Sequence, residues 1–150
     1  MLRRRLRVRR LRRRIAARGL QACVAIVEHC NDMPAAYMLA DVVVSASVEP
    51  EAFGRVAVEA QAMGRPVVAT DHGGARETVM RGRCGWLVPP GDAGATARAI
   101  TEALSLDAAA RADLAATARA HVRTHFTVET MCARTLDVYR ELLPTPTRDR

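Results

Sequence analysis

The sequence contains no lysine, so all 23 basic residues are arginines. Together with the abundant alanine, we interpret this as the mark of a GC-rich coding sequence, without functional meaning. Aromatic residues are also scarce, at 3%, so the core must be built from aliphatic side chains. Apolar residues make up 49% of the 150 residues, which is enough for one folded domain and argues against wholesale disorder.

The four cysteines show no CxxC spacing, and no signal peptide is visible. Reduced, mostly buried thiols are therefore expected, without disulfides. No apolar run approaches the roughly 20 residues that a helix needs to cross a bilayer. These absences favour a cytoplasmic protein, with a peripheral position at the inner membrane face as the alternative.

The charge is divided unevenly along the chain. Residues 1–20 hold ten arginines and no acidic residue, whereas residues 21–150 hold thirteen arginines and sixteen acidic residues. The net charge of +7 thus comes from the first segment, and the rest of the chain is mildly acidic. This argues against a basic nucleic-acid-binding face on the folded domain itself.

The arginine-rich segment "LRRRLRVRRLRRRIAAR", residues 2–18, has apolar residues at roughly helical spacing. Three interpretations remain open: a solvated helix of the domain, an arm that binds a membrane surface or nucleic acid, or a poorly ordered start. A transit peptide is the weakest alternative, because the segment lacks serine.

Apolar strands and helical segments alternate after residue 21. Strands are expected at 22–29, 41–47, 65–71 and 85–88, and helices at 32–40, 53–64, 73–80, 92–104, 108–124 and 128–143. This order predicts an α/β fold with a partial Rossmann-like parallel sheet of about four strands, flanked by helices and followed by C-terminal helices. The predicted parts are an arginine-rich arm at 1–20, the domain at 21–143 and a frayed tail at 144–150.

In such sheets, ligands bind at the carboxyl ends of the strands. The loop after the predicted strand 41–47 carries Glu51, Phe53 and Gly54 in the stretch "EPEAFGRVAVEA". Glu59 lies on the next helix, with seven residues between the two glutamates. A carboxylate half-buried among apolar neighbours needs hydrogen-bond donors, and the paired hydroxyls of a ribose supply them.

The first N–H groups of the same helix have no partner within the helix. We expect those of Gly54, Arg55 and Val56 to hold a phosphate, and a glycine lets a ligand approach the backbone closely. The pattern thus predicts a site for a nucleoside diphosphate sugar, with the sugar near Glu51 and Phe53. The alternative is that both glutamates are solvated and bind nothing; taken alone, the pair would favour that alternative.

The stretch resembles the donor-binding signature of the retaining glycosyltransferases of family 4, or group 1, which have the GT-B fold. The signature is written E-x-F-G-x-x-x-x-E-A, then G-x-P-V-V-A-T and G-G-x-x-E. The matching residues are Glu51, Phe53, Gly54, Glu59, Ala60, Gly64, Pro66, Val67, Val68, Ala69, Thr70, Gly73, Gly74 and Glu77. The later "GWLVPPGD" and "HFTVETMCARTLDVYRELL" also match, so the resemblance covers about residues 20–143.

The resemblance implies a role for each matched residue. Glu51 and the backbone of Phe53 and Gly54 would contact the donor sugar; Gly54, Arg55 and Val56 would hold the diphosphate; Glu59 would hold the ribose. His29, His72, Gly73 and Gly74 are possible contacts to the base or the sugar. No metal and no cofactor are expected, because the nucleotide sugar is a substrate.

The chain departs from the family pattern in two respects. Whole enzymes have two Rossmann-like domains, and a "G-R-x-x-x-x-K-G" element whose Arg and Lys clamp the diphosphate; neither that element nor any lysine occurs here. We therefore expect a truncated C-terminal donor-binding domain that needs a missing N-terminal Rossmann domain and is inactive alone. The alternatives are a non-catalytic partner subunit and a basic-arm protein that binds nucleic acid or anionic lipid. The acceptor stays open between a glycan, a lipid-linked sugar and a small molecule.

Overall fold

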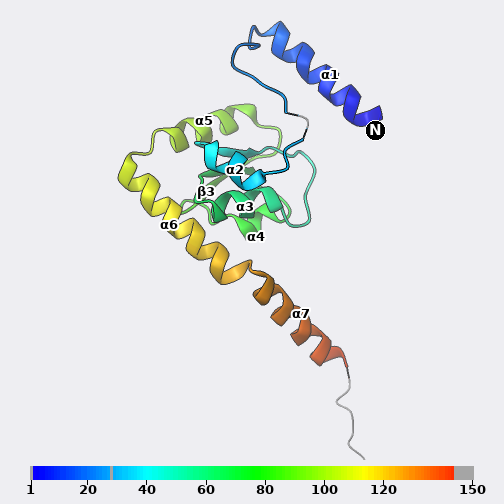
Figure 1. The fold of residues 1–150 in the computed structure, drawn as a ribbon, viewed down its shortest axis with the longest axis vertical. Coiled ribbons are helices and arrows are strands. Elements are labelled where there is room, and N and C mark those ends of the chain that lie inside the picture. The colour runs from blue at the N-terminus through cyan, green and yellow to red at the C-terminus, as the bar shows by residue number, and fades with distance from the viewer. Residues whose placement is uncertain (1, 28, 144–150) are drawn as a thin grey trace, which may run out of the picture. The chain divides into compact units, whose positions relative to one another are not determined.

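A computed structural model describes residues 2–27 and 29–143 (Figure 1). The chain divides into two compact units, Met1–Asn31 and Asp32–Arg150. The predicted frayed tail, 144–150, lies outside the described residues. None of the described helices combines the length and the apolar character that a membrane crossing requires.

The first unit consists of one helix and an irregular segment. The arginine-rich start, for which three interpretations were open, forms helix α1, Leu2–Ala17. Within the unit, Ile15 is buried, whereas Leu6 and Leu11 are exposed, as are the arginines between Arg7 and Arg14. Among the described side chains, Val8, Leu11 and Ile15 lie on one side of the helix, and the arginines occupy the other sides.

The predicted strand at 22–29 does not form among the described residues, so this expectation is wrong. The amides of Cys23 and Val24 instead donate to the carbonyl of Leu20, as in a turn. Val24 and Val27 are exposed. An apolar run becomes a strand only where a neighbouring strand offers its backbone groups, and no described strand pairs with this segment.

The second unit is built on a parallel sheet of three strands. Their order is β1 (Val43–Ser45), β2 (Val67–Thr70) and β3 (Gly85–Val88). Both pairings are parallel. The α/β class with a parallel sheet and flanking helices is therefore confirmed, with three strands in place of about four.

Helices cover both faces of this sheet. Successive side chains of β2 point to opposite faces of the sheet. Because both faces are covered, all four residues of β2 are buried. On one face, Val67 and Ala69 pack in a cluster with residues of helices α2 and α3. On the other, Val68 packs with Ala99 of helix α5.

The helices of the second unit lie close to their predicted positions. They are α2 (Met33–Leu39), α3 (Arg55–Ala62), α4 (Ala75–Thr78), α5 (Ala93–Leu104), α6 (Ala108–His125) and α7 (Val128–Leu142). Four of them begin after a residue whose side chain accepts an otherwise unpaired backbone N–H, namely Asp32, Asp92, Asp107 and Thr127. Helix α3 ends before Gly64, which has a φ of 69°.

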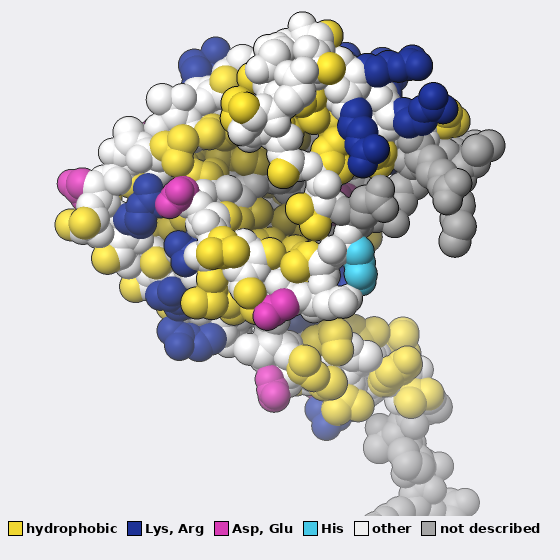
Figure 2. Space-filling model, turned by 45° about the horizontal axis from the view of Figure 1, so that its top comes forward, with side chains coloured by type: hydrophobic (Ala, Val, Ile, Leu, Met, Phe, Trp, Pro, Cys, Tyr) yellow, Lys and Arg dark blue, Asp and Glu magenta, His cyan; other side chains and the backbone are white. Residues whose placement is uncertain are grey.

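Helix α7 is exposed on all sides within the described structure, since it buries none of its residues. Its apolar side chains, among them Met131, Leu136 and Tyr139, are more than half exposed. They form the group of yellow side chains next to the grey tail in Figure 2. The stability of the second unit therefore comes from the sheet and from helices α2 to α6.

A buried glutamine links α3 to the loop between β2 and β3. The amide nitrogen of Gln61 donates to the carbonyls of Ala57 and Thr78, at 3.0 and 2.9 Å. Its oxygen accepts from the thiol of Cys84, at 2.8 Å. All the polar atoms of this fully buried side chain therefore have partners within the core.

We expect Gln61→Leu to lower the free energy of unfolding by about 1–3 kcal/mol, because it leaves the buried carbonyl of Thr78 without this donor. Urea denaturation followed by circular dichroism measures the change. The control is Gln21→Leu, because Gln21 is exposed. Its effect is expected to stay within about 0.5 kcal/mol. Equal losses in the two variants would contradict this role of Gln61.

Candidate functional site

Two loops meet at the carboxyl edge of the sheet. One loop, 46–54, follows β1, and the other, 71–74, follows β2. The hydroxyl of Thr70 donates to the carbonyl of Ser47 at 2.8 Å, and the amide of Gly74 donates to the carbonyl of Glu51 at 2.9 Å. Residues far apart in the sequence are thus held side by side at the edge where parallel sheets bind ligands.

Gly74 sets how closely the two loops approach. A Cβ at this position would lie 2.5 Å from the backbone of Phe53, closer than real Cβ contacts allow. Gly74 itself has an ordinary φ of −61°, so any residue could adopt its backbone conformation. The absent side chain is therefore needed for space and not for conformational freedom.

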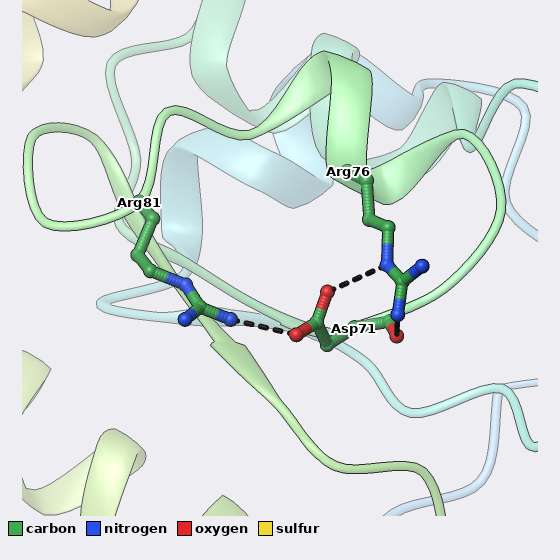
Figure 3. A network of polar contacts seen from close by, with 3 residues as sticks. All are labelled: Asp71, Arg76 and Arg81. Carbon is green, nitrogen blue, oxygen red and sulfur yellow. Dashed lines mark hydrogen bonds and ion pairs between the residues drawn. The ribbon is translucent and has the colours of Figure 1, made fainter.

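Asp71 fixes the start of the second loop (Figure 3). One carboxylate oxygen accepts from Arg76 Nε at 2.9 Å, and the other accepts from Arg81 Nη2 at 2.7 Å. Arg76 also donates to the backbone carbonyl of Asp71. The hydrogen bond from Arg76, together with both guanidinium charges, lowers the pKa of Asp71 below its ordinary value. Asp71 thus stays ionised and links the start of the second loop to Arg76 and Arg81.

The first loop leads directly into the N-terminus of α3. Gly54 precedes the helix with a φ of 77°, the left-handed region that glycine adopts without strain. In the described structure the N–H groups of Arg55 and Val56 donate no hydrogen bond to the protein. The Val56 side chain packs against the core, so only its backbone faces outward. The start of α3 thus presents unpaired donors at the positive end of a helix dipole.

The carboxylate of Glu59 has two partners of different character. Its Oε2 accepts from the hydroxyl of Tyr37 at 2.9 Å, and its Oε1 accepts from Arg55 Nη2 at 2.9 Å. The Glu59 side chain is 36% exposed and that of Arg55 is 82% exposed, whereas Tyr37 is 6% exposed. Glu59 is therefore fixed from the protein side and open on the other.

The pKa of Tyr37 is strongly raised at this position. Burial raises its pKa to about 12, and the hydrogen bond to Glu59 and the charge of that carboxylate act in the same direction. The charge of Arg55 partly opposes them. The phenol therefore remains a hydrogen-bond donor over the whole physiological range.

Glu51 lies at a separate small hollow. Its Oε1 accepts from the hydroxyl of Ser47 at 2.6 Å. His72 lines the same hollow, together with Glu51 and Gly54, and its Nε2 lies 3.0 Å from the carbonyl of Ser47. The other ring nitrogen of His72 is buried without a partner among the described residues. A carboxylate and an imidazole thus lie together beside the start of α3.

A larger groove lies between α3 and α7, with a volume of about 790 Å³. Phe53, Arg55 and Glu59 line one side, and Phe126 and Met131 line the other. This volume lies within the usual range of small-molecule sites. The rings of Phe53 and Phe126 meet edge to face with centroids 5.7 Å apart, so the floor of the groove is aromatic.

The histidine pair His121 and His125 does not form a metal site with other described residues. Neither these histidines nor any other described His, Cys, Asp or Glu residues form a group of three that could hold a metal ion. The rings of His121 and Phe126 meet edge to face, with centroids 5.2 Å apart. Burial, and then the charge of His125, lower the pKa of His121, so it is neutral at physiological pH.

The structure brings together most of the residues predicted for the site. Glu51, Gly54 and His72 share the hollow, and Phe53, Arg55 and Glu59 share the groove. The predicted contacts of Gly73 and Gly74 with a ligand stay predictions; both glycines lie directly against the first loop. His29 belongs to the first unit, and its role stays a prediction as well.

Three residues of the site were missed from the sequence: Tyr37, Ser47 and Phe126. Tyr37 lies 22 residues before the carboxylate that it contacts, and no spacing rule connects them. The one usable signal was the tyrosine itself, because a buried phenol needs a hydrogen-bond partner. Ser47 and Phe126 offered no comparable signal.

The family model "Glycosyl transferases group 1" matches residues 6–121 of this chain. The chain belongs to this family. The D-inositol 3-phosphate glycosyltransferase of Salinispora tropica is 43% identical over 111 residues, which are 74% of this chain and 22% of that protein. The first curated relatives are thus about four times as long as the part that this chain matches.

Solved structures agree with this assignment. A glycosyltransferase from Rickettsia africae superposes with a TM-score of 0.87 at 35% identity, over 92% of this chain and 37% of the other. HepE of Anabaena, crystallised with UDP and glucose, superposes with a TM-score of 0.86 at 32% identity, over 94% of this chain and 38% of the other. The Rossmann-like fold of this family member is thereby confirmed.

We expect Gly74→Ala to destabilise the protein by about 1–3 kcal/mol, because the added methyl group overlaps the backbone of Phe53 and forces the loops apart. Thermal unfolding followed by circular dichroism gives the change. Gly94→Ala is the matched control, because Gly94 lies within helix α5, where a Cβ would meet only side-chain atoms 3.4 Å away. That variant should be unchanged or more stable. A Gly74→Ala protein as stable as the wild type would show that the loops do not depend on this contact.

The raised pKa of Tyr37 predicts a stability change at alkaline pH. The unfolded chain releases the phenol proton near the ordinary pKa of 10.0, whereas the folded protein holds it up to about 12. The contribution of the protonated phenol to the free energy of unfolding is therefore complete below pH 10 and is lost as the pH rises towards 12. Between these values the wild type should lose up to about 2 kcal/mol more than Tyr37→Phe.

Urea denaturation at several pH values measures this difference. Both proteins contain the same cysteines, so the effect of thiol ionisation on stability cancels in the comparison. If the free energies of unfolding of the wild type and Tyr37→Phe change in parallel with pH, the pKa of Tyr37 is not raised.

Proposed function

We propose that this chain binds the nucleoside diphosphate sugar donor of a glycosyltransferase. The observation that carries the proposal is that Glu51, in the loop at the carboxyl edge of the sheet, is followed in chain order by the start of α3 and by Glu59 on that helix. A carboxylate suits the hydroxyls of a sugar, unpaired N–H groups suit a diphosphate, and a second carboxylate suits the ribose. The three chemistries follow one another in the order of the parts of such a donor.

The diphosphate is assigned to the start of α3. The N–H groups of Arg55 and Val56 and the positive end of the helix dipole attract an anion, and Gly54 leaves the backbone open to it. The guanidinium of Arg55 is 82% exposed, and we assign it a contact with a phosphate in place of its ion pair with Glu59. This set of donors stabilises the leaving diphosphate without a metal, so the proposed site needs no cofactor.

The sugar is assigned to the surface outside the hollow that Glu51 lines, because the hollow itself, at about 10 Å³, has room for about one water molecule. Ser47 holds Glu51 by a hydrogen bond of 2.6 Å, which leaves the second carboxylate oxygen for sugar hydroxyls. His72 and Gly54 line the same hollow, and Phe53 directly precedes Gly54 in the loop. Fixed groups of this kind catalyse transfer by positioning the anomeric carbon. We assign retention of configuration to the reaction from the family resemblance.

Transfer to an acceptor requires more than this chain contains. The chain spans 22–27% of the first curated relatives that it matches. We propose that a second Rossmann-like domain supplies the acceptor site. The names of the relatives include a D-inositol 3-phosphate glycosyltransferase and a phosphatidyl-myo-inositol mannosyltransferase, so the acceptor class varies among them.

The proposal predicts that Glu59→Gln weakens binding of a nucleotide sugar. Hydrogen bonds to a charged acceptor contribute about 1.5–3 kcal/mol, so the dissociation constant should rise roughly 10- to 100-fold. Isothermal titration calorimetry with UDP-glucose, GDP-mannose and ADP-glucose identifies the donor that binds and then measures the change.

The control is Glu102→Gln on helix α5, which removes an exposed carboxylate outside the proposed site. It should bind the donor as the wild type does. If none of the three donors binds the wild type, or if Glu59→Gln binds as tightly as Glu102→Gln, the proposed function is wrong.

A further inference from the structure

The ribose contact of the proposed site depends on how Glu59 is held. A free glutamate side chain samples many rotamers, and fixing it costs conformational entropy. Glu59 is held by Tyr37 at one oxygen and by Arg55 at the other, both at 2.9 Å. The two partners differ in exposure, because the Arg55 side chain is 82% exposed and Tyr37 is 6% exposed.

Tyr37 is itself fixed by its surroundings. Its ring packs in the core cluster with Val43 of β1 and with Ala57 and Ala60 of α3. Helix α2, which carries it, is capped by Asp32, whose side chain accepts from the amide of Ala35 at 3.0 Å. The hydroxyl therefore has a defined position relative to α3 and can hold Glu59 before any ligand arrives.

The bond leaves most of the carboxylate free. An ionised carboxylate can accept about four hydrogen bonds, and Tyr37 uses one position on Oε2. When the exposed Arg55 turns away, both lone pairs of Oε1 and one of Oε2 remain. The two neighbouring hydroxyls of a ribose match this arrangement, because each can donate to one oxygen.

We propose that Tyr37 is a positioning residue that holds the Glu59 carboxylate ready for both ribose hydroxyls, and so makes the site select ribonucleotides over 2′-deoxyribonucleotides. This inference rests on the proposed function. The raised pKa of Tyr37, about 12, is consistent with it, because the phenol stays protonated and keeps donating to the carboxylate.

A role limited to tying α2 to α3 makes a different prediction. In that case the loss of the hydroxyl would weaken all nucleotides by the same factor, through a general loosening of the site. A positioning role instead affects the ligand that carries both hydroxyls more than the ligand that lacks one. The ratio of the two affinities therefore separates the two explanations.

The test uses the full chain and its Tyr37→Phe variant, which keeps the ring in the core. UDP, GDP and ADP are titrated first, and the tightest binder is then compared with its 2′-deoxy form by isothermal titration calorimetry. We expect the wild type to prefer the ribose form roughly 10-fold or more, as loss of one hydrogen bond to a charged group predicts. In Tyr37→Phe this preference should fall at least about 5-fold, mainly through weaker binding of the ribose form.

Two variants complete the design. Tyr139→Phe, which changes the other tyrosine of the chain, is exposed on α7 and should retain the wild-type preference. In a Glu59→Gln background, adding Tyr37→Phe should change the preference no further, because the two residues act through one contact. Circular dichroism verifies that each variant is folded.

The outcomes separate this inference from the proposed function. If the wild type binds none of the nucleotides, the proposed function fails and this inference fails with it. If the wild type binds and Tyr37→Phe weakens the ribose and deoxyribose forms equally, or not at all, the positioning role is wrong while the proposed function stands.

Discussion

The site depends on one close contact, in which the loop after β2 packs directly on the backbone of the loop after β1. This contact requires the missing side chain of Gly74, because a Cβ there would lie 2.5 Å from Phe53. The hydrogen bonds from Gly74 to Glu51 and from Thr70 to Ser47 hold the same two segments together. The direction in which α3 starts, and therefore the positions of its free N–H groups and of Glu59, follows from this contact.

The two glutamates are prepared for binding in the same way, although they lie at separate hollows. Each accepts from a hydroxyl group: Ser47 of the same loop donates to Glu51, and Tyr37 of helix α2 donates to Glu59. A neutral donor fixes the carboxylate without cancelling its charge, whereas a buried guanidinium would neutralise it and compete with the ligand. The guanidinium of Arg55 is highly exposed instead, so a ligand can displace it at little cost.

Local signals allowed much of the fold to be predicted. The strand predicted at 22–29 was wrong because strand formation depends on pairing with a distant segment. Asp32 and Asp107 cap helices α2 and α6, and Gly64 follows α3 with a positive φ. Helix ends of this kind are predictable because capping involves residues only a few positions apart. The segment 22–29 has the composition of a strand, yet the described structure gives it no partner. Strand formation is decided by a neighbour that composition cannot reveal.

The same distinction separates the predicted site residues from those that were missed. Glu51 and Glu59 were predictable because the turn and the helix between them fix their relation within one short stretch. Tyr37 was not, because its contact with Glu59 arises only when α2 packs on α3. A sequence pattern thus predicts the groups that are proposed to contact a ligand, while the residues that hold those groups in place become visible only in the packed structure. For this family member, the buried phenol behind Glu59 therefore adds to the site a constraint that the family signature does not include.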